Sequence, residues 1–286
     1  MVSTHATLLG IGAILLWSTL ATLTVLSSGL LPFQTTAITF AIGGSIIACA
    51  AIAGGRASCM KPTFASLALG IYGLFGYHAL YFSALRLAPP AEAHLVSSLW
   101  ALLIVLFSAL LPGHRLRLNH VAGALLGFAG AALLVWPRIG TEAAGATSSG
   151  LGFLLALGCA LVWSSYSVTS RLLAAVPSES LAVSCFATAA LATLCHLLFE
   201  TWVAPPSATA WAALIALGAG PVGAAFLLWD IGMKQGDTSL LGVLAYASPV
   251  ISTGLLVALG LAAPTWTLAA ACALMVAAAV IATRPG

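Results

Sequence analysis

The sequence has very little charge. Only 5% of its 286 residues are Asp, Glu, Lys or Arg, whereas 62% are hydrophobic. A soluble domain carries about 25% charged residues, so a water-soluble fold is excluded. The net charge of +3 is too small to indicate nucleic acid as a partner. The composition therefore predicts a chain whose solvent is the lipid bilayer.

Motifs for catalysis and for nucleotide or metal binding are also missing. The sequence has no P-loop, no HExxH, no GxSxG and no pair of carboxylates within an apolar run. Its six cysteines show no CxxC spacing. The connections between apolar runs are too short to form a soluble ATP-binding domain. We therefore expect neither an enzyme nor a primary pump, and no cofactor or metal.

Long apolar runs fill most of the chain. About 20 apolar residues cross a bilayer as a helix, and barrel strands would instead alternate every second residue. The sequence thus predicts an all-α integral membrane protein with ten transmembrane helices. They are residues 4–26, 34–53, 63–85, 91–111, 118–136, 150–172, 180–199, 209–233, 239–259 and 265–283.

The basic residues predict the orientation in the membrane. With the N-terminus inside, seven Lys and Arg residues fall in inner loops and the C-terminus, whereas Arg86 and Arg138 fall in outer loops. The positive-inside rule then predicts that both termini are cytoplasmic, in a multi-pass protein of the inner (plasma) membrane. The start, MVSTHATLL, lacks the basic region of a signal peptide, so we expect the first run to be a permanent helix.

The two halves of the chain resemble each other. LLWST at residues 15–19 recurs as LVWSS at 161–165, an offset of 146, and residues 81–96 recur more faintly at an offset of 148. Five helices follow five, and because five is odd the second set is inverted in the membrane. We predict two inverted five-helix repeats, residues 1–140 and 141–286. Such repeats favour alternating access around a site near the bilayer midplane.

Two tryptophans occupy unusual places in these helices. Tryptophan usually collects at the membrane interfaces, but Trp17 and Trp163 lie near the centres of the first and sixth helices at equivalent positions. Two interpretations stay open. The rings either fill the bundle as core residues or form matched walls of a midplane cavity, with hydroxyls such as that of Ser164 beside them.

The stretch GYHALYFSAL, residues 76–85, brings polar groups into the third helix. Tyr77, His78 and Tyr81 share one broad patch of a helix, and ionisable groups in a membrane usually face the bundle interior. His78 is interpreted either as a structural histidine or as a cavity residue that hydrogen-bonds a substrate.

The eighth helix contains an acid and a proline. Asp230 precedes Lys234 by four residues, which favours a stabilising ion pair, with a gating or proton-carrying role as the alternative. Pro221 stands among glycines, which favours close helix packing or, alternatively, a moving joint.

The paired Trp-Ser sequences and the run ALRLAPPAEAHLVSSLW, residues 84–100, resemble the drug/metabolite transporter superfamily, EamA type, and the resemblance spans essentially the whole chain. Leu99 and Trp100 resemble a pair typical of its bacterial aromatic amino acid exporter branch. That branch usually continues with proline, whereas Ala101 follows here and Pro249 keeps the proline in the second half.

The resemblance implies export of aromatic and other neutral amino acids by alternating access. Because titratable groups within the apolar runs are few, we expect the transport to be facilitative. The alternative is proton-coupled efflux of drugs or other small metabolites. A monomer in the lipid bilayer with a small-molecule substrate is expected. The expected substrate-binding residues are Trp17, Tyr77, His78, Tyr81, Ser97, Trp100, Trp163, Ser164 and Tyr246, and the expected gating or coupling residues are Asp230, Pro221 and Pro249.

Overall fold

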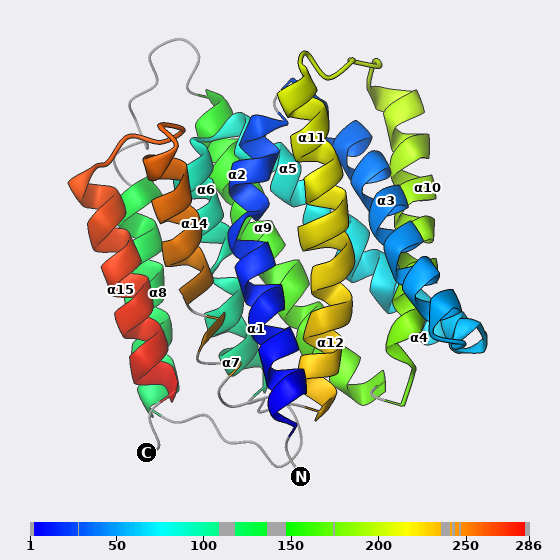
Figure 1. The fold of residues 1–286 in the computed structure, drawn as a ribbon. Helices are drawn as coiled ribbons and strands as arrows, with labels where there is room; N and C mark the ends of the chain where they lie inside the picture. Colours follow the sequence, from blue (N-terminus) through cyan, green and yellow to red (C-terminus); the bar gives the residue numbers. More distant parts are fainter. Residues whose placement is uncertain are drawn as a thin grey trace.

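The computed structural model describes residues 3–27, 29–108, 118–135, 147–173, 175–235, 241, 244–245 and 247–283. All regular elements within these residues are helical (Figure 1). The α-helices are α1 (Thr4–Ser18), α2 (Leu20–Leu26), α3 (Pro32–Ala53), α4 (Phe64–Ile71), α5 (Tyr77–Leu87), α6 (Pro90–Ser97), α7 (Trp100–Ser108), α8 (Leu118–Val135), α9 (Thr147–Ser170), α10 (Leu181–Phe199), α11 (Ala208–Leu217), α12 (Ala225–Gln235), α14 (Ala247–Ala258) and α15 (Trp266–Thr283). Short 3₁₀ helices are η1 (Ala57–Met60), η4 (Arg171–Leu173) and η5 (Ser178–Ser180), and π-helical segments are η2 (Tyr72–Gly76) and η6 (Gly218–Ala224).

The helices form an apolar bundle. Six helical spans among the described residues are long and apolar enough to cross a membrane: Thr4–Leu26, Pro32–Ala53, Phe64–Leu87, Ser149–Ser170, Ser178–Phe199 and Ala208–Gly232. Four shorter apolar helices cover Pro90–Ile104, Val121–Leu134, Ala247–Ala258 and Trp266–Ile281. The all-α fold predicted from the sequence is confirmed, and ten crossings stay a prediction.

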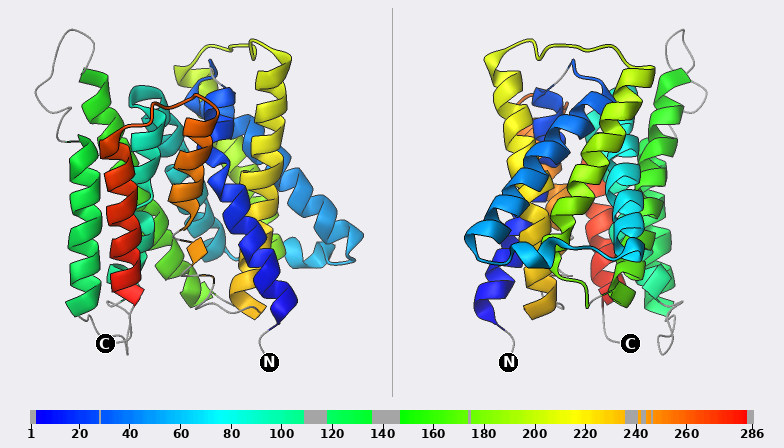
Figure 2. Two further views of the ribbon diagram at one scale, coloured as in Figure 1. Left: turned by 60° about the vertical axis from the view of Figure 1, so that its left-hand side comes forward. Right: turned by 90° about the vertical axis from the view of Figure 1, so that its right-hand side faces the viewer.

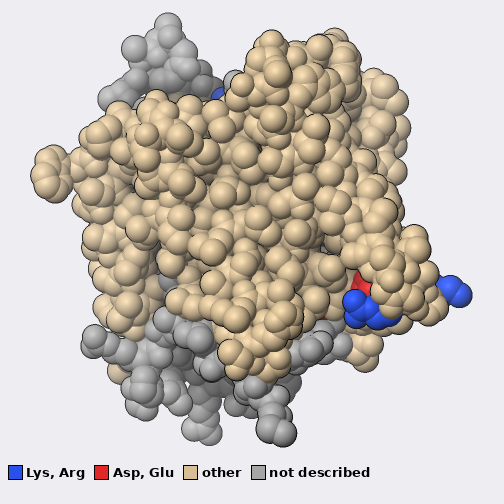
Figure 3. Space-filling view, in the orientation of Figure 1, with Lys and Arg blue, Asp and Glu red and all other residues tan. Residues whose placement is uncertain are grey.

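The charged residues and the two termini lie at the ends of the helix bundle. The beginning of α1 and the end of α15 lie at the same end (Figure 1). On the face that Figure 3 shows, acidic and basic side chains lie near that end, close to the connection after α3, a further basic side chain lies at the opposite end, and the middle carries no charge. Arg56 there forms an ion pair with Glu179 at 2.8 Å. An uncharged belt of this kind suits a bilayer.

Helices from the two halves of the sequence pack in pairs. α3 lies against α10 and α8 against α15 (Figure 2), while α1 packs on α12 and α5 on α9. Glycine allows one of these contacts to be very close, because a Cβ on Gly43 of α3 would lie 3.1 Å from the Cα of Gly223 in η6. The two halves therefore interlock along the whole bundle.

The helical geometry changes near the middle of several spans. The π-helical segments η2 and η6 begin at Tyr72 and Gly218, an offset of 146 residues. Pro221 lies inside η6 and has no N–H to donate. The helix of the first span is interrupted at Thr19, between α1 and α2. Backbone carbonyls left without a helical partner at such places are available to side chains.

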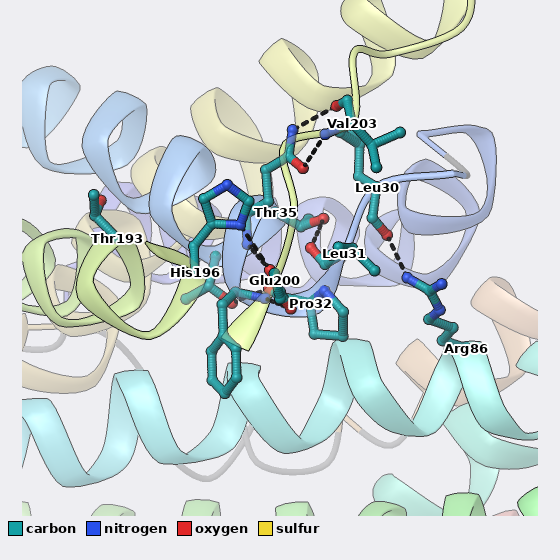
Figure 4. Close-up of polar contacts among 12 residues, drawn as sticks. Leu30, Leu31, Pro32, Thr35, Arg86, Thr193, His196, Glu200 and Val203 are labelled. Carbon is teal, nitrogen blue, oxygen red and sulfur yellow. Dashed lines mark hydrogen bonds and ion pairs between the residues drawn. The ribbon is translucent and has the colours of Figure 1, made fainter. Parts of the chain in front are cut away.

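A polar clasp joins one end of α3 to the end of α10 (Figure 4). The Glu200 carboxylate accepts the backbone N–H groups of Phe33 and Gln34, both at 3.0 Å, and contacts His196 Nδ1 at 2.9 Å. The Gln34 amide donates to the Val203 carbonyl at 2.6 Å and accepts the Val203 N–H at 3.1 Å. These five residues form what we name the Glu200 clasp. It caps the first turn of α3 from another helix, because α3 has no capping side chain of its own.

Candidate functional site

Aromatic rings from several helices meet inside the bundle. Trp17 of α1 and Trp163 of α9 lie edge to face, with ring centroids 6.2 Å apart. Phe226 of α12 lies 6.0 Å from Trp17 and 5.8 Å from Trp163. The two tryptophans that the repeat marks as equivalent are thus brought together. The rings named in this and the next two paragraphs form the aromatic cluster.

The tyrosines of α5 extend the cluster to one side. Tyr77 stacks on Tyr81 at 5.5 Å and lies 5.3 Å from Trp163. The Tyr81 hydroxyl is hydrogen-bonded to His94 Nδ1 at 2.9 Å. No local pattern marks His94 as a functional residue, because the contact depends on how α6 folds back against α5. The patch within residues 76–85 therefore faces the bundle interior.

His78 lies in the same cluster and is almost fully buried. Its Nδ1 donates to the Leu74 carbonyl at 2.9 Å, and its ring lies edge to face with Phe40 at 4.7 Å. The Phe226 ring is 6.1 Å away. His78 follows η2 by two residues and Phe226 follows η6 by two, so equivalent positions of the two halves face each other. One is polar and the other is apolar.

The Trp17 ring is fixed by the π-helical segment η6. Its indole Nε1 donates to the Pro221 carbonyl at 3.1 Å. The indole of Trp163 makes no such hydrogen bond to any described residue. Pro221 therefore positions Trp17, and this contact could not be read from the sequence because it depends on the local π geometry. The predicted gating role of Pro221 stays a prediction.

The predicted hydroxyl residues lie beside the cluster. Ser164 is buried and its hydroxyl donates to the Ala160 carbonyl at 2.6 Å. The Ser97 hydroxyl donates to the His94 carbonyl at 2.8 Å, and its side chain faces Tyr77. Both hydroxyls are near the rings, and both are satisfied within their own helices.

The remaining predicted residues are more scattered. Trp100 is half-buried against Ile14 and Leu241, away from the ring contacts of the cluster. Pro249 lines a small groove between α6, α7, α14 and α15. Tyr246 lies outside the described residues.

Asp230 is half-buried in α12 and faces Tyr166 of α9. The side chain of Lys234 lies outside the described residues, so the predicted ion pair stays a prediction. Among the residues that the structure describes, no group of His, Cys, Asp and Glu is arranged to hold a metal ion.

The arrangement can recognise an aromatic ring but carries little charge. Each well-oriented aromatic contact contributes about 0.5–1.5 kcal/mol beyond burial of its area. A flat substrate ring among Trp17, Trp163, Tyr77 and Phe226 would make several such contacts. The arrangement therefore offers binding and selection of an aromatic ring.

Comparison with known proteins agrees with a transport role. The EamA-like transporter family matches residues 4–136 and 150–284. An aromatic amino acid exporter, YddG, of Ancylobacter novellus is 55% identical over 99% of this chain and 98% of its own length. The aromatic amino acid exporters YddG of Salmonella typhimurium and Escherichia coli are 26% and 27% identical, each over 89% of this chain and 88% of its own length. A solved crystal structure at 55% identity superposes with a TM-score of 0.79 and covers 98% of this chain and 97% of its own.

Proposed function

The chain belongs to the EamA-like transporter family, and from this premise we propose that it exports aromatic amino acids from the cytoplasm by alternating access around the aromatic cluster. It is a multi-pass membrane transporter and not an enzyme. The observation that carries the proposal is the 55% identity, over almost the full length, to a protein named as an aromatic amino acid exporter. The cluster of rings between the two halves gives that substrate class a physical basis.

The membrane arrangement is the second part of the proposal. Ten transmembrane helices form two inverted repeats, residues 1–140 and 141–286, in the inner membrane with both termini cytoplasmic. The matching positions of η2 and η6 and the pairing of helices across the two halves support the repeat. The basic side chains near the connection after α3, at the end where α1 begins, support the orientation. The transporter works as a monomer.

Substrate binding is assigned to the cluster and its borders. The ring of the substrate stacks among Trp17, Tyr77 and Trp163, with His78, Tyr81, Ser97, Trp100, Ser164 and Tyr246 at the borders of the site. A few aromatic contacts give a dissociation constant near a millimolar, about 4 kcal/mol. Weak binding suits an exporter that must release its substrate outside. Pro221 and Pro249 allow the flanking helices to bend.

Counterflow in liposomes tests this function. Purified protein is reconstituted into liposomes loaded with unlabelled L-tryptophan, and entry of labelled L-tryptophan, L-phenylalanine and L-alanine is followed. We expect rapid exchange of the two aromatic amino acids and slower exchange of alanine. If no amino acid enters faster than it enters liposomes without the protein, the assignment is wrong.

Facilitative transport and proton-coupled transport assign different roles to His78, which would carry the proton only in the coupled mechanism. His78 is a buried imidazole of the cluster, and an imidazole titrates near physiological pH in water. We propose that the carrier needs no proton gradient, because ionisable groups are costly to place in a membrane and the apolar runs of this sequence contain few of them. Flux is compared with and without an imposed pH difference, for the natural protein and for His78→Gln. Flux that requires the gradient, and loses that requirement in His78→Gln, would instead establish proton-coupled efflux.

A further inference from the structure

Four buried hydroxyls line the contact between the first span and α14. They are Ser18 of α1, Thr22 of α2, and Ser248 and Ser252 of α14, with exposed fractions of 0%, 5%, 8% and 0%. The Ser18 and Ser248 hydroxyls are hydrogen-bonded to each other, with their oxygens 3.2 Å apart. We name these four residues the hydroxyl strip.

The strip continues along both helices in the same direction. The first span and α14 run parallel from their beginnings to the upper end (Figure 1), and α14 packs against both α1 and α2. Thr22 follows Ser18 by four residues, and Ser252 follows Ser248 by four, so both lie one turn further along the face that carries the Ser18–Ser248 contact. The four hydroxyls therefore border one interface.

Two of these hydroxyls lack a hydrogen-bond partner in the packed bundle. Thr22 Oγ1 and Ser252 Oγ are buried and make no hydrogen bond to any described residue. The Ser18 hydroxyl, in contrast, donates to the Ile14 carbonyl at 2.8 Å. An unpaired buried hydroxyl costs about 1–3 kcal/mol, so helix packing alone gives no reason for the polar side chains.

The equivalent interface in the other half shows that the helix contact does not require hydroxyls. At the repeat offsets of 146 for the first span and 148 for α14, the counterparts of Thr22, Ser248 and Ser252 are apolar or aromatic. They are Val168, Trp100 and Ile104. One half thus provides polar atoms where the other provides apolar surface, which is the asymmetry that an amphipathic substrate needs.

We propose that the hydroxyl strip binds the ammonium and carboxylate groups of the amino acid whose ring occupies the aromatic cluster. This proposal rests on the proposed function. Trp17 and Ser18 are adjacent in α1, so one helical turn holds both parts of the substrate. Hydroxyls donate to a carboxylate and accept from an ammonium group. The carbonyls at the end of α1 carry partial negative charge that favours the ammonium.

The packing of α14 against the first span corresponds to a state of the transport cycle in which the hydroxyl strip holds no substrate. With α14 against the first span, the strip is closed and two hydroxyls are unpaired. When the helices separate, the head of the substrate enters and pairs with them. The unpaired hydroxyls make the closed, empty interface less stable, so it reopens readily for another substrate.

The test compares a ligand that has the charged head with one that lacks it. Binding of L-tryptophan and of indole is measured by calorimetry or scintillation proximity on the purified full chain. The variants are Thr22→Val and Ser252→Ala, alone and combined, and Thr22→Ser to restore the hydroxyl. Thr188→Val on α10 is the matched control, because Thr188 Oγ1 is also buried and unpaired but lies in another part of the bundle.

We expect the double variant to weaken L-tryptophan binding about five- to tenfold and to leave indole binding within twofold. Thr22→Ser should bind L-tryptophan more tightly than Thr22→Val, and Thr188→Val should bind both ligands like the natural protein. An equal loss of affinity for both ligands, or no loss for either, would overturn the proposal. The proposed function would still stand if the natural protein shows counterflow of L-tryptophan. Absence of counterflow by the natural protein would remove both.

Discussion

The α3–α10 pair and the aromatic cluster lie side by side but are held together differently. The pair is fastened at one end by the Glu200 clasp (Figure 4). At the other end it is fastened by the Arg56–Glu179 ion pair. In the cluster, in contrast, rings meet at tilted and edge-to-face angles, and its hydrogen bonds to backbone carbonyls fix single rings. Directional charged contacts specify one geometry, whereas ring contacts tolerate several.

The difference suggests a division of labour. An alternating-access carrier needs surfaces that stay together and surfaces that exchange partners. The fastened pair suits the first task, and the cluster with the α1–α14 interface suits the second. Substitutions in each region test this comparison. Those in the α3–α10 pair should mainly lower stability, whereas those in the aromatic cluster and the α1–α14 interface should mainly lower transport.

Among single substitutions, the largest effect is expected from Trp163→Ala. The substitution removes the ring that contacts Trp17, Tyr77, Tyr166 and Phe226. Loss of about two substrate contacts of 0.5–1.5 kcal/mol each should lower L-tryptophan exchange about tenfold or more. Exchange is measured in liposomes, and size-exclusion chromatography checks the fold.

Trp17→Ala is the parallel test at the equivalent position. A monodisperse but inactive protein supports a binding role for both rings. If both variants aggregate, the tryptophans are core residues that fill the bundle, which is the alternative that the sequence leaves open.

The next largest effect is expected from Glu200→Ala, which should lower the stability of the α3–α10 pair. Glu200→Ala leaves the N–H groups of Phe33 and Gln34 without their acceptor and His196 without its partner. Buried hydrogen bonds to a charged group contribute about 1.5–3 kcal/mol, so the thermal unfolding midpoint should fall by several degrees. Exchange at temperatures well below the midpoint should stay close to that of the natural protein. If the Glu200→Ala variant unfolds at the normal temperature but no longer exchanges L-tryptophan, the clasp belongs to the surfaces that move during transport.

Composition and repeat predicted the fold well because bilayer physics restricts it. Long apolar runs must form helices, and the described α-helices lie largely within the predicted runs, while ten membrane crossings stay a prediction. The local breaks were harder. Pro221 and the glycines around it indicated an irregular eighth span, but the similar change at residues 72–76 has no proline to mark it.

The grouping of the candidate site residues was predictable where the repeat duplicated a residue and not where distant helices meet, and the binding role of these residues stays a prediction. Trp17 and Trp163 stood out as an equivalent pair, and the structure brings them together. Phe226 did not stand out, because a phenylalanine in an apolar helix is ordinary and its position opposite His78 depends on two matched π-helical segments. The Glu200 clasp joins residues more than 160 positions apart, and no local pattern signals such a contact.

A smaller effect is expected from Trp17→Phe. The ring stays aromatic, but the hydrogen bond from the indole to the Pro221 carbonyl is lost. One neutral hydrogen bond contributes about 0.5–1.5 kcal/mol, so exchange should fall about threefold. Trp163→Phe is the control, because its indole has no equivalent bond to a described residue, and it should lose less. A larger loss in Trp163→Phe would mean that the η6 contact does not position the ring.

The smallest effect is expected from a covalent link within the fastened pair. A Cβ built on Gly44 of α3 would lie 3.2 Å from the Cβ of Cys185 in α10. Disulfides need about 3.5–4.5 Å between these atoms, so Gly44→Cys requires a shift of only a few tenths of an ångström. If α3 and α10 stay together throughout transport, the oxidised variant should exchange L-tryptophan within about twofold of its reduced form. Mass spectrometry of the joined peptides verifies the link.

The matched link across the other region should behave in the opposite way. Ser18→Cys combined with Ser248→Cys places two thiols where the hydroxyls are 3.2 Å apart, and a disulfide there would hold α1 against α14. Oxidation should stop exchange, and reductant should restore it to the level of the same variant before oxidation. Comparing each variant with its own reduced form separates the effect of the link from that of the substitutions. If the Gly44→Cys link also stopped exchange reversibly, α3 would have to slide along α10, and contacts at both ends of the pair would have to break in every cycle.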